Sequence, residues 1–115
     1  MQFKKVYTRS TSKRPAVETE YESAIIPGKC IAIRRVDNTA STKPTVFHIG
    51  DMAEYDSYNL SYIGVIESIT NKTITIKPAH NERAKRLDLY TFAWRNYNFD
   101  LEKARANNAE TMMYI

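Results

Sequence analysis

The fold of this chain is decided by the stretch Tyr62–Pro78, which reads YIGVIESITNKTITIKP. Two runs rich in Ile, Val and Thr lie on either side of the polar tetrapeptide Thr70–Thr73. The second run alternates Ile with Thr, which is the period of a strand with one face in a core. A polar turn of this length between two such runs predicts an antiparallel hairpin, with strands over residues 59–69 and 73–78.

Further strands are expected on both sides of this hairpin. Cys30–Val36 is rich in Ile and Val and follows a Pro-Gly-Lys turn, so it reads as a buried strand. Thr45–Asp56 reads as one strand that Gly50 interrupts, which indicates a bulge or a sharp bend. Arg86–Trp94 is expected to be the fifth strand. Residues 15–26 fit either a half-exposed strand or a helix, and we favour the extended form.

The period of the sequence changes at Asp100, which is a good N-cap for a helix over residues 100–111. Residues 1–14 hold five basic side chains and no acidic one, and we expect them to be a partly ordered arm. Residues 15–115 then form a single domain. We therefore predict a mainly β fold, a small bent barrel of about five antiparallel strands with a C-terminal helix.

Composition excludes several classes of protein. A chain of 115 residues with 43% hydrophobic residues is one small globular domain. Its single cysteine, Cys30, excludes a framework of disulfides within the chain. No apolar run approaches the ~20 residues that a membrane span needs, so no membrane association is expected. The net charge of +4 is a mild bias towards anionic partners.

The sequence carries no motif that predicts an enzyme. His48 and His80 lie on different segments, and neither has the spacing of a metal ligand. Three glycines in the whole chain are too few for the known phosphate-binding loops. We predict a binding protein with no catalytic residue, no metal and no cofactor.

The densest cluster of candidate binding residues is FAWRNYNFD, residues 92–100. One interpretation is structural: Asn side chains shape the turn between the fifth strand and the helix, and Asp100 caps that helix. The other adds a pocket in which rings stack on a base, Arg side chains bind phosphate and Asn amides read an edge. The candidate ligand-binding residues are Trp94, Arg95, Asn96, Asn98 and Phe99, with Arg34 and Arg86 for phosphate and Tyr58 and Tyr62 for stacking.

The segment Tyr55–Tyr62, YDSYNLSY, is a second candidate surface because three tyrosines surround short polar side chains. Tyrosine offers a flat ring with a polar tip at low entropic cost, which suits recognition of a protein or a base. The alternative is an ordinary turn between two strands. Both interpretations stay open.

Two resemblances extend these expectations. The spacing IGDMAEYD followed by Tyr62–Pro78 resembles the central strands of SH3-like barrels. The pattern AEYDSYNLSYIGVI, KTITI and RLDLYTFAWRNYNFD, which spans about residues 53–100, resembles small accessory proteins of tailed phages. Such proteins often counter host defence, by sequestering a signalling nucleotide as Thoeris anti-defence proteins do, or by binding a defence protein as anti-CRISPRs do.

These resemblances imply a phage-type protein that acts in the cytoplasm of the host cell. Our first expectation is an anti-defence protein that sequesters an anionic nucleotide, with its pocket near residues 92–100. The alternatives are an anti-CRISPR-like inhibitor that binds a host defence protein and a small-barrel protein that binds nucleic acid. We expect a homo-oligomer, because the C-terminal helix is too weak to persist without packing.

Overall fold

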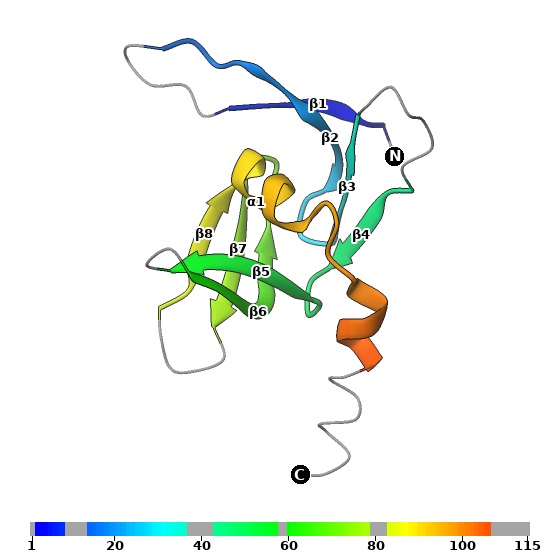
Figure 1. Cartoon of the computed structure of the whole chain (residues 1–115), viewed down its shortest axis with the longest axis vertical. Helices are drawn as coiled ribbons and strands as arrows, with labels where there is room; N and C mark the ends of the chain where they lie inside the picture. The colour runs from blue at the N-terminus through cyan, green and yellow to red at the C-terminus, as the bar shows by residue number, and fades with distance from the viewer. Residues whose placement is uncertain (1, 9–13, 37–42, 58–59, 79–82, 107–115) are drawn as a thin grey trace.

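The computed structural model describes residues 2–8, 14–36, 43–57, 60–78 and 83–106 of the chain. Eight strands form two antiparallel sheets of four strands each, and a short helix lies between the sheets (Figure 1). The first sheet has the order β1-β2-β3-β4, and its strands are Lys4–Tyr7, Glu18–Ile26, Cys30–Arg35 and Thr45–His48. The second has the order β5-β6-β7-β8, and its strands are Met52–Ser57, Leu60–Ile69, Thr73–Pro78 and Lys85–Asp88.

Every strand pairs with its neighbour in the sequence, so each sheet is a simple meander. The predicted hairpin is confirmed as β6 and β7, joined by a turn in which the Thr70 hydroxyl accepts from the backbone N–H of Thr73 at 2.9 Å. The ambiguous residues form a strand, β2, and the predicted buried strand is β3. Four residues of the expected N-terminal arm form β1, whose Val6 lies in the core.

Gly50 marks the place where the chain passes from one sheet to the other. The expected single strand Thr45–Asp56 is two strands, β4 and β5, separated by a turn in which Gly50 has φ +97°. A left-handed φ of this kind favours glycine. The backbone N–H of Gly50 donates to the carbonyl of Ile66 at 2.9 Å, which ties this turn to the second sheet. The predicted bend is confirmed, and it is sharp enough to divide the strand.

The prediction of a fifth strand over Arg86–Trp94 is wrong for most of these residues. β8 ends at Asp88, and the helix α1 (Leu89–Asn96) begins directly after it. The carboxylate of Asp88 accepts a hydrogen bond from the backbone N–H of Thr91 at 3.0 Å and caps the helix. Phe92, Ala93 and Asn96 are the buried residues of α1, and their spacing of three and four is that of a helix face.

The core lies between the inner faces of the two sheets and is closed by α1. Phe47 of the first sheet meets Phe92 of α1 edge to face, with ring centroids 5.2 Å apart. The side chains that are almost completely inaccessible come from both sheets and from the helix: Val6, Ile31, Ile33, Phe47, Ile66, Ile74, Ile76, Phe92 and Asn96. A mainly β fold is confirmed, but its eight strands exceed the five predicted, and they form two sheets.

A second short helix spans residues 101–106. Asp100 caps it as predicted, because its carboxylate accepts from the backbone N–H of Lys103 at 3.0 Å. Leu101 is buried, and the guanidinium of Arg105 holds Asp51 through two hydrogen bonds of 3.0 and 2.7 Å. The predicted residues 107–111 of this helix lie outside the part of the chain that the structure describes.

Candidate functional site

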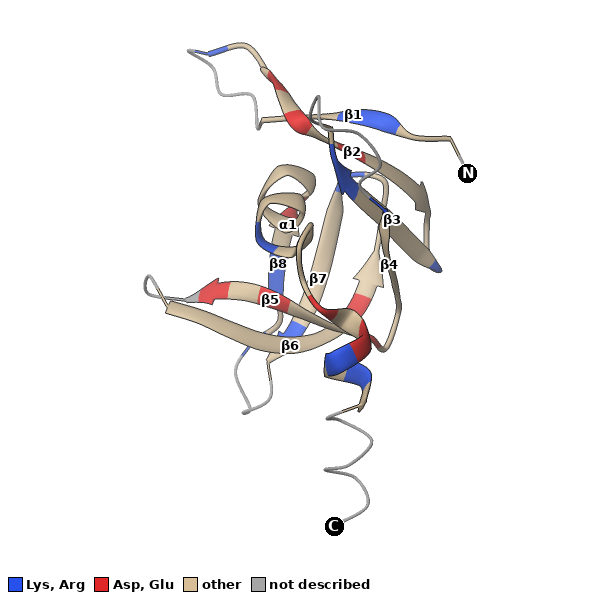
Figure 2. Cartoon of the chain, turned by 45° about the vertical axis from the view of Figure 1, so that its right-hand side comes forward, with Lys and Arg blue, Asp and Glu red and all other residues tan. Residues whose placement is uncertain are grey.

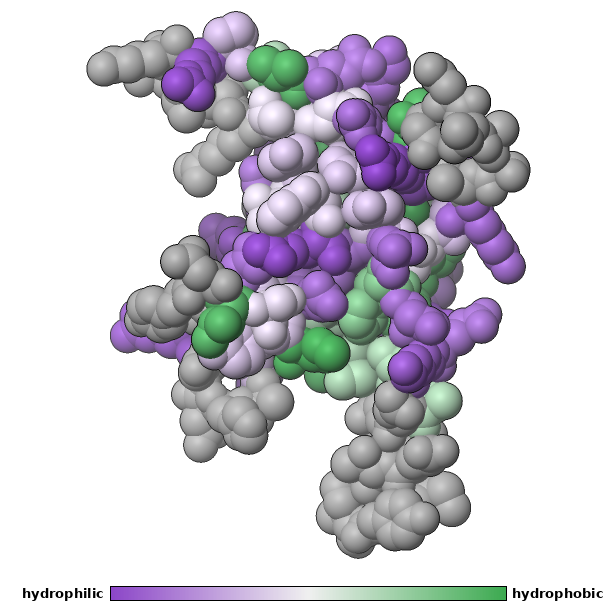
Figure 3. All heavy atoms as spheres, in the orientation of Figure 1, coloured by the Kyte–Doolittle hydropathy of each residue, from purple (hydrophilic) through white to green (hydrophobic). Residues whose placement is uncertain are grey.

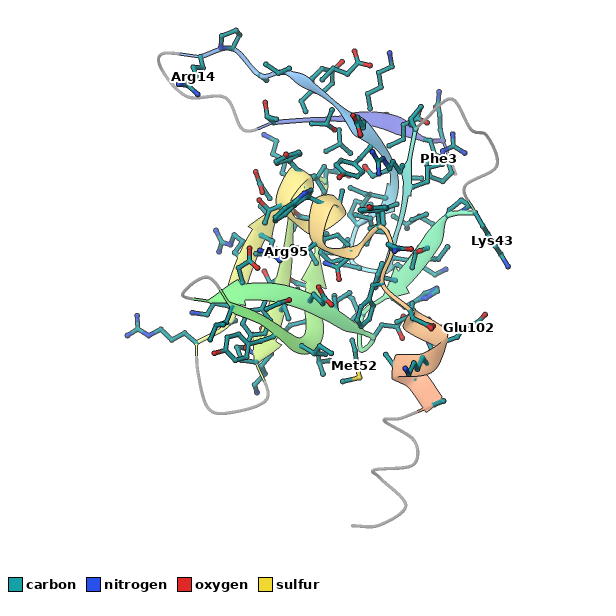
Figure 4. All side chains as sticks on the ribbon, viewed as in Figure 1. Phe3, Arg14, Lys43, Met52, Arg95 and Glu102 are labelled. Carbon is teal, nitrogen blue, oxygen red and sulfur yellow. The ribbon has the colours of Figure 1, made fainter. Side chains whose placement is uncertain are left out.

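A cleft of about 600 Å³ opens between the end of β3, the start of β4 and the segment that joins the two helices. Its volume lies in the range of small-molecule sites. The lining residues combine cations, rings and small polar groups: Arg34, Arg35, Lys43, Thr45, Tyr97, Asn98, Phe99 and Asp100. Lys43 projects from the molecule at this end of the first sheet (Figure 4).

Two of the three cations of the cleft, Arg34 and Arg35, are neighbours at the end of β3. The guanidinium of Arg34 lies 3.1 Å from the Glu22 carboxylate, and that of Arg35 lies 2.9 Å from Glu20. Figure 2 shows these basic positions on β3 beside the acidic positions of β2. Lys43 is exposed and forms no ion pair with any residue that the structure describes.

The guanidinium of Arg35 is fixed from two sides. The side-chain hydrogen bond with Glu20, followed by the charge of that carboxylate and a hydrogen bond with Tyr97, raises the pKa of Arg35 above its ordinary value. Its guanidinium carbon also lies 5.7 Å from the centre of the Tyr97 ring. Arg35 is therefore held beside an aromatic ring, in the geometry of a cation–π contact.

Two aromatic rings line the cleft, and each is supported from behind. Tyr97 packs against Tyr21, with centroids 5.4 Å apart, and Phe99 stacks on Phe47 at 6.1 Å and 23°. The hydroxyl of Thr45 donates to the carbonyl of Tyr97 at 3.3 Å, which anchors the segment to β4. Because Tyr97 and Phe99 are only half-buried, part of each ring remains for a flat ligand.

Three of the predicted site residues meet in this cleft: Arg34, Asn98 and Phe99. Arg35, Lys43 and Tyr97 were missed as ligand-binding residues. The Arg34–Arg35 pair and the tyrosine between two asparagines were visible in the sequence. The sequence did not show that these residues lie together in space, because this depends on how the chain turns back onto the first sheet at the end of α1.

Arg95 and Trp94 form a separate cluster on α1. The guanidinium of Arg95 lies 2.6 Å from the Asp56 carboxylate and 4.3 Å from the centre of the Trp94 ring. Both residues belong to the helix and not to the end of a fifth strand. Neither residue lines the cleft.

Asn96 has a structural role. Its side chain is fully buried and hydrogen-bonds to the backbone of both Glu54 and Phe92, so no part of it faces a ligand. Tyr62 lies on β6 and stacks on the buried Tyr55 at 5.8 Å, and Arg86 is exposed on β8. Tyr58 lies outside the described residues.

Within the described ranges of the chain, no three His, Cys, Asp or Glu side chains gather in a way that would hold a metal ion. No described helix has the length and the apolar character to cross a membrane.

Comparison of the chain with models of protein families, with curated proteins and with solved structures finds no significant match. The resemblances to phage accessory proteins and to SH3-like barrels therefore stay predictions.

Proposed function

We propose that this protein is a non-enzymatic binding protein for a small anionic ligand of nucleotide type, held in the cleft between β3, β4 and residues 97–100. The observation that carries the proposal is the convergence of three cations and two half-exposed rings on one cleft of about 600 Å³. A nucleotide needs both kinds of contact, since its phosphates are anionic and its base is flat and apolar.

The cations would bind the phosphates. The pair between Arg35 and Glu20 is largely exposed, and exposed pairs of this kind contribute only ~0–1 kcal/mol. A phosphate that accepts two hydrogen bonds from the guanidinium therefore replaces Glu20 at small cost. Lys43, which has no described ion-pair partner, adds a second positive charge at the mouth of the cleft.

The rings would hold the base. Stacking on an aromatic side chain contributes about 1–3 kcal/mol per base. Tyr97 and Phe99 are already fixed by Tyr21 and Phe47, so little ordering is needed when a base arrives. Asn98 is exposed beside them and offers an amide to the edge of a base.

Isothermal titration calorimetry with matched fragments tests the proposal. The probes are adenosine, inorganic pyrophosphate and ADP. We expect measurable binding of ADP and at least tenfold weaker binding of both fragments, since each lacks one set of contacts. A flat response to ADP, and to the corresponding guanine, cytosine and uracil diphosphates, would overturn the proposal.

Paired variants test whether the cleft is the site. Arg35→Gln and Lys43→Ala remove cations of the cleft, whereas Lys72→Ala removes an exposed lysine of the β6–β7 turn. We expect the first two to weaken ADP binding about tenfold each and the third to leave it unchanged. Equal effects of Lys43→Ala and Lys72→Ala on the affinity for ADP would mean that binding depends only on the net charge of the protein.

Sequestration of a host signalling nucleotide is the biological role that the phage resemblance adds to this proposal. The same kind of binding experiment distinguishes this role from the two alternatives, which are a nucleic-acid-binding protein and an inhibitor that binds a host defence protein. Salt-sensitive binding of an oligonucleotide with no binding of ADP would favour a nucleic-acid-binding protein. The Tyr55–Tyr62 segment gives less support to a protein-binding surface, because Tyr55 is buried.

A further inference from the structure

The outer face of the second sheet carries an apolar row that is partly exposed to solvent and that the segment 98–104 borders at Ile63. Ile63 and Val65 of β6 point away from the core and are 44% and 43% exposed. Met52 lies directly opposite Val65 on β5 and extends the row. Figure 3 shows apolar side chains on the part of the surface formed by β5 and β6, next to the helix 101–106.

This face also has an acidic side and a basic side. Cross-strand partners share a face, so Glu54 stands beside Ile63 on β5, and Lys77 stands beside Val65 on β7. Arg86 pairs with Thr75 and adds a second cation on β8. Across the outer face from β5 to β8, the acidic side chain therefore comes first, the apolar row next and the basic side chains last.

One further acid, Glu67, lies on β6, the strand that carries the apolar row. It occupies the bulge between Ile66 and Ser68, and its charge offsets one of the two cations, Lys77 and Arg86. The basic side keeps a net positive charge beyond the apolar row.

An acidic side, an apolar centre and a basic side make a surface that is complementary to itself. If a second copy is placed face to face, a two-fold axis that lies in the interface and runs along the apolar row, parallel to β6, brings the acidic side of each copy over the basic side of the other. An isologous interface of this kind repeats each contact twice. The apolar rows then pack on each other, as in a sandwich of two sheets about 10 Å apart.

The size of the face is compatible with such a dimer. β6 has ten residues, which corresponds to about 34 Å of strand, and four strands span roughly 14 Å between the outermost axes. A standard interface buries about 800 Å² per partner, close to a tenth of the 8388 Å² accessible surface of this chain.

We propose that the outer face of the sheet β5–β8 is the interface of a homodimer, in which Ile63 and Val65 form the apolar centre and Glu54 of each copy meets Lys77 of the other. None of the residues Glu54, Ile63, Val65 and Lys77 lines the ligand cleft, although Asn98, Phe99 and Asp100 of the cleft border Glu54 and Ile63 on their other side. The dimer therefore does not depend on the proposed ligand.

Sedimentation velocity of the full chain between about 5 and 500 µM tests the proposal. We expect a species of twice the 13.3 kDa chain mass to become dominant within this range. Val65→Glu is expected to shift the midpoint of dimer formation at least tenfold higher in concentration. Val17→Glu is the matched control, because Val17 is 58% exposed and belongs to the segment before β2.

A charge exchange identifies the partner surface. Glu54→Lys and Lys77→Glu each place like charges against each other and are expected to weaken the dimer. The double variant restores both contacts with reversed signs and is expected to recover most of the dimer. Far-ultraviolet circular dichroism confirms that each variant is folded.

Three results would overturn the proposal. The first is a wild-type chain that stays monomeric throughout the concentration range. The second is a dimer that Val65→Glu and Val17→Glu affect equally. The third is a double variant that dimerises no better than either single charge reversal.

Discussion

The side chain of Asn96 takes the place of a neighbouring strand beside Glu54. Its Oδ1 accepts from the backbone N–H of Glu54 at 2.7 Å, and its Nδ2 donates to the carbonyl of the same residue at 3.1 Å. Glu54 lies on β5, the edge strand of the second sheet. A third hydrogen bond, from Nδ2 to the carbonyl of Phe92 at 3.1 Å, fixes the amide to its own helix. One buried amide thus closes part of an open sheet edge and attaches α1 to it.

Replacing Asn96 is therefore expected to be among the most damaging single changes in the chain. Asn96→Asp removes both donated hydrogen bonds and places a carboxylate in a buried site, which we expect to cost at least about 3 kcal/mol. Urea denaturation monitored by Trp94 fluorescence measures the change. Asn98→Ala is the control, since Asn98 is exposed two residues later. Similar stabilities of the two variants would contradict this role.

Gly64 is expected to tolerate no side chain. A Cβ built on it would lie 2.6 Å from both Cγ2 of Ile76 and the carbonyl oxygen of Lys77, so the two central strands of the second sheet would have to separate. Overpacking of this kind typically costs about 1–3 kcal/mol. The thermal midpoint of Gly64→Ala compared with that of Ser61→Ala, an exposed position on the same strand, measures the effect. An unchanged midpoint for Gly64→Ala would show that the strands have room to adjust.

Attachment of the helix 101–106 is expected to weaken in acid. Burial by itself raises the pKa of Asp51, but hydrogen bonds from Arg105 and from the backbone of His48, with the charge of Arg105, outweigh it and leave the pKa below the ordinary value. A lowered pKa means that the contribution to stability is present above the unfolded pKa of about 3.9 and is lost as the pH falls through the folded value.

The variant Arg105→Gln measures that contribution. We expect it to be less stable than the wild type at pH 7, by less than about 1 kcal/mol because the arginine is half exposed. The difference should shrink as the pH falls below about 4 and disappear once Asp51 is protonated in both proteins. Lys103→Ala, on the same helix, should show no such dependence. A difference that stays constant with pH would mean that Arg105 acts through packing alone.

Arg95 is expected to affect stability and leave ligand binding unchanged. Arg95→Ala removes the ion pair with Asp56 and the contact with Trp94, which together contribute about 1 kcal/mol. Because the indole loses its cationic neighbour, the fluorescence of Trp94 should also change. Titration of the folded variant with ADP should give the wild-type affinity. A loss of ADP binding without loss of stability would place Arg95 in the ligand site after all.

The sequence predicted the strands from β2 to β7, with β4 and β5 taken as one strand. The β6–β7 hairpin and β3 follow from apolar runs bounded by turn residues, and Gly50 was identified as a bend. The residues of α1 misled the prediction because Leu89, Tyr90, Phe92 and Trp94 fit a strand by type and by partial alternation. The signals that favoured a helix were the cap at Asp88 and the helical spacing of Phe92, Ala93 and Asn96.

The candidate site was predicted in part for a related reason. Asn98 and Phe99 were recognised because they lie in a dense aromatic and polar segment, and Arg34 because it belongs to a basic pair. Lys43 lies two residues before β4, and only the pairing of β3 with β4 brings it near Arg34. Asn96 was assigned to the ligand because a sequence does not show which amides are buried.

The passage of the chain through Gly50 has a consequence for how the protein is made on the ribosome. All strands of the first sheet are translated before any strand of the second, and each finds its partner next to it in the chain. The inner side chains Val6, Ile31, Ile33 and Phe47 nevertheless gain their full cover only when Phe92 and its helix emerge, after the strands of both sheets. The nascent first half is thus a sheet without a core, exposed to water and to chaperones until α1 completes the fold.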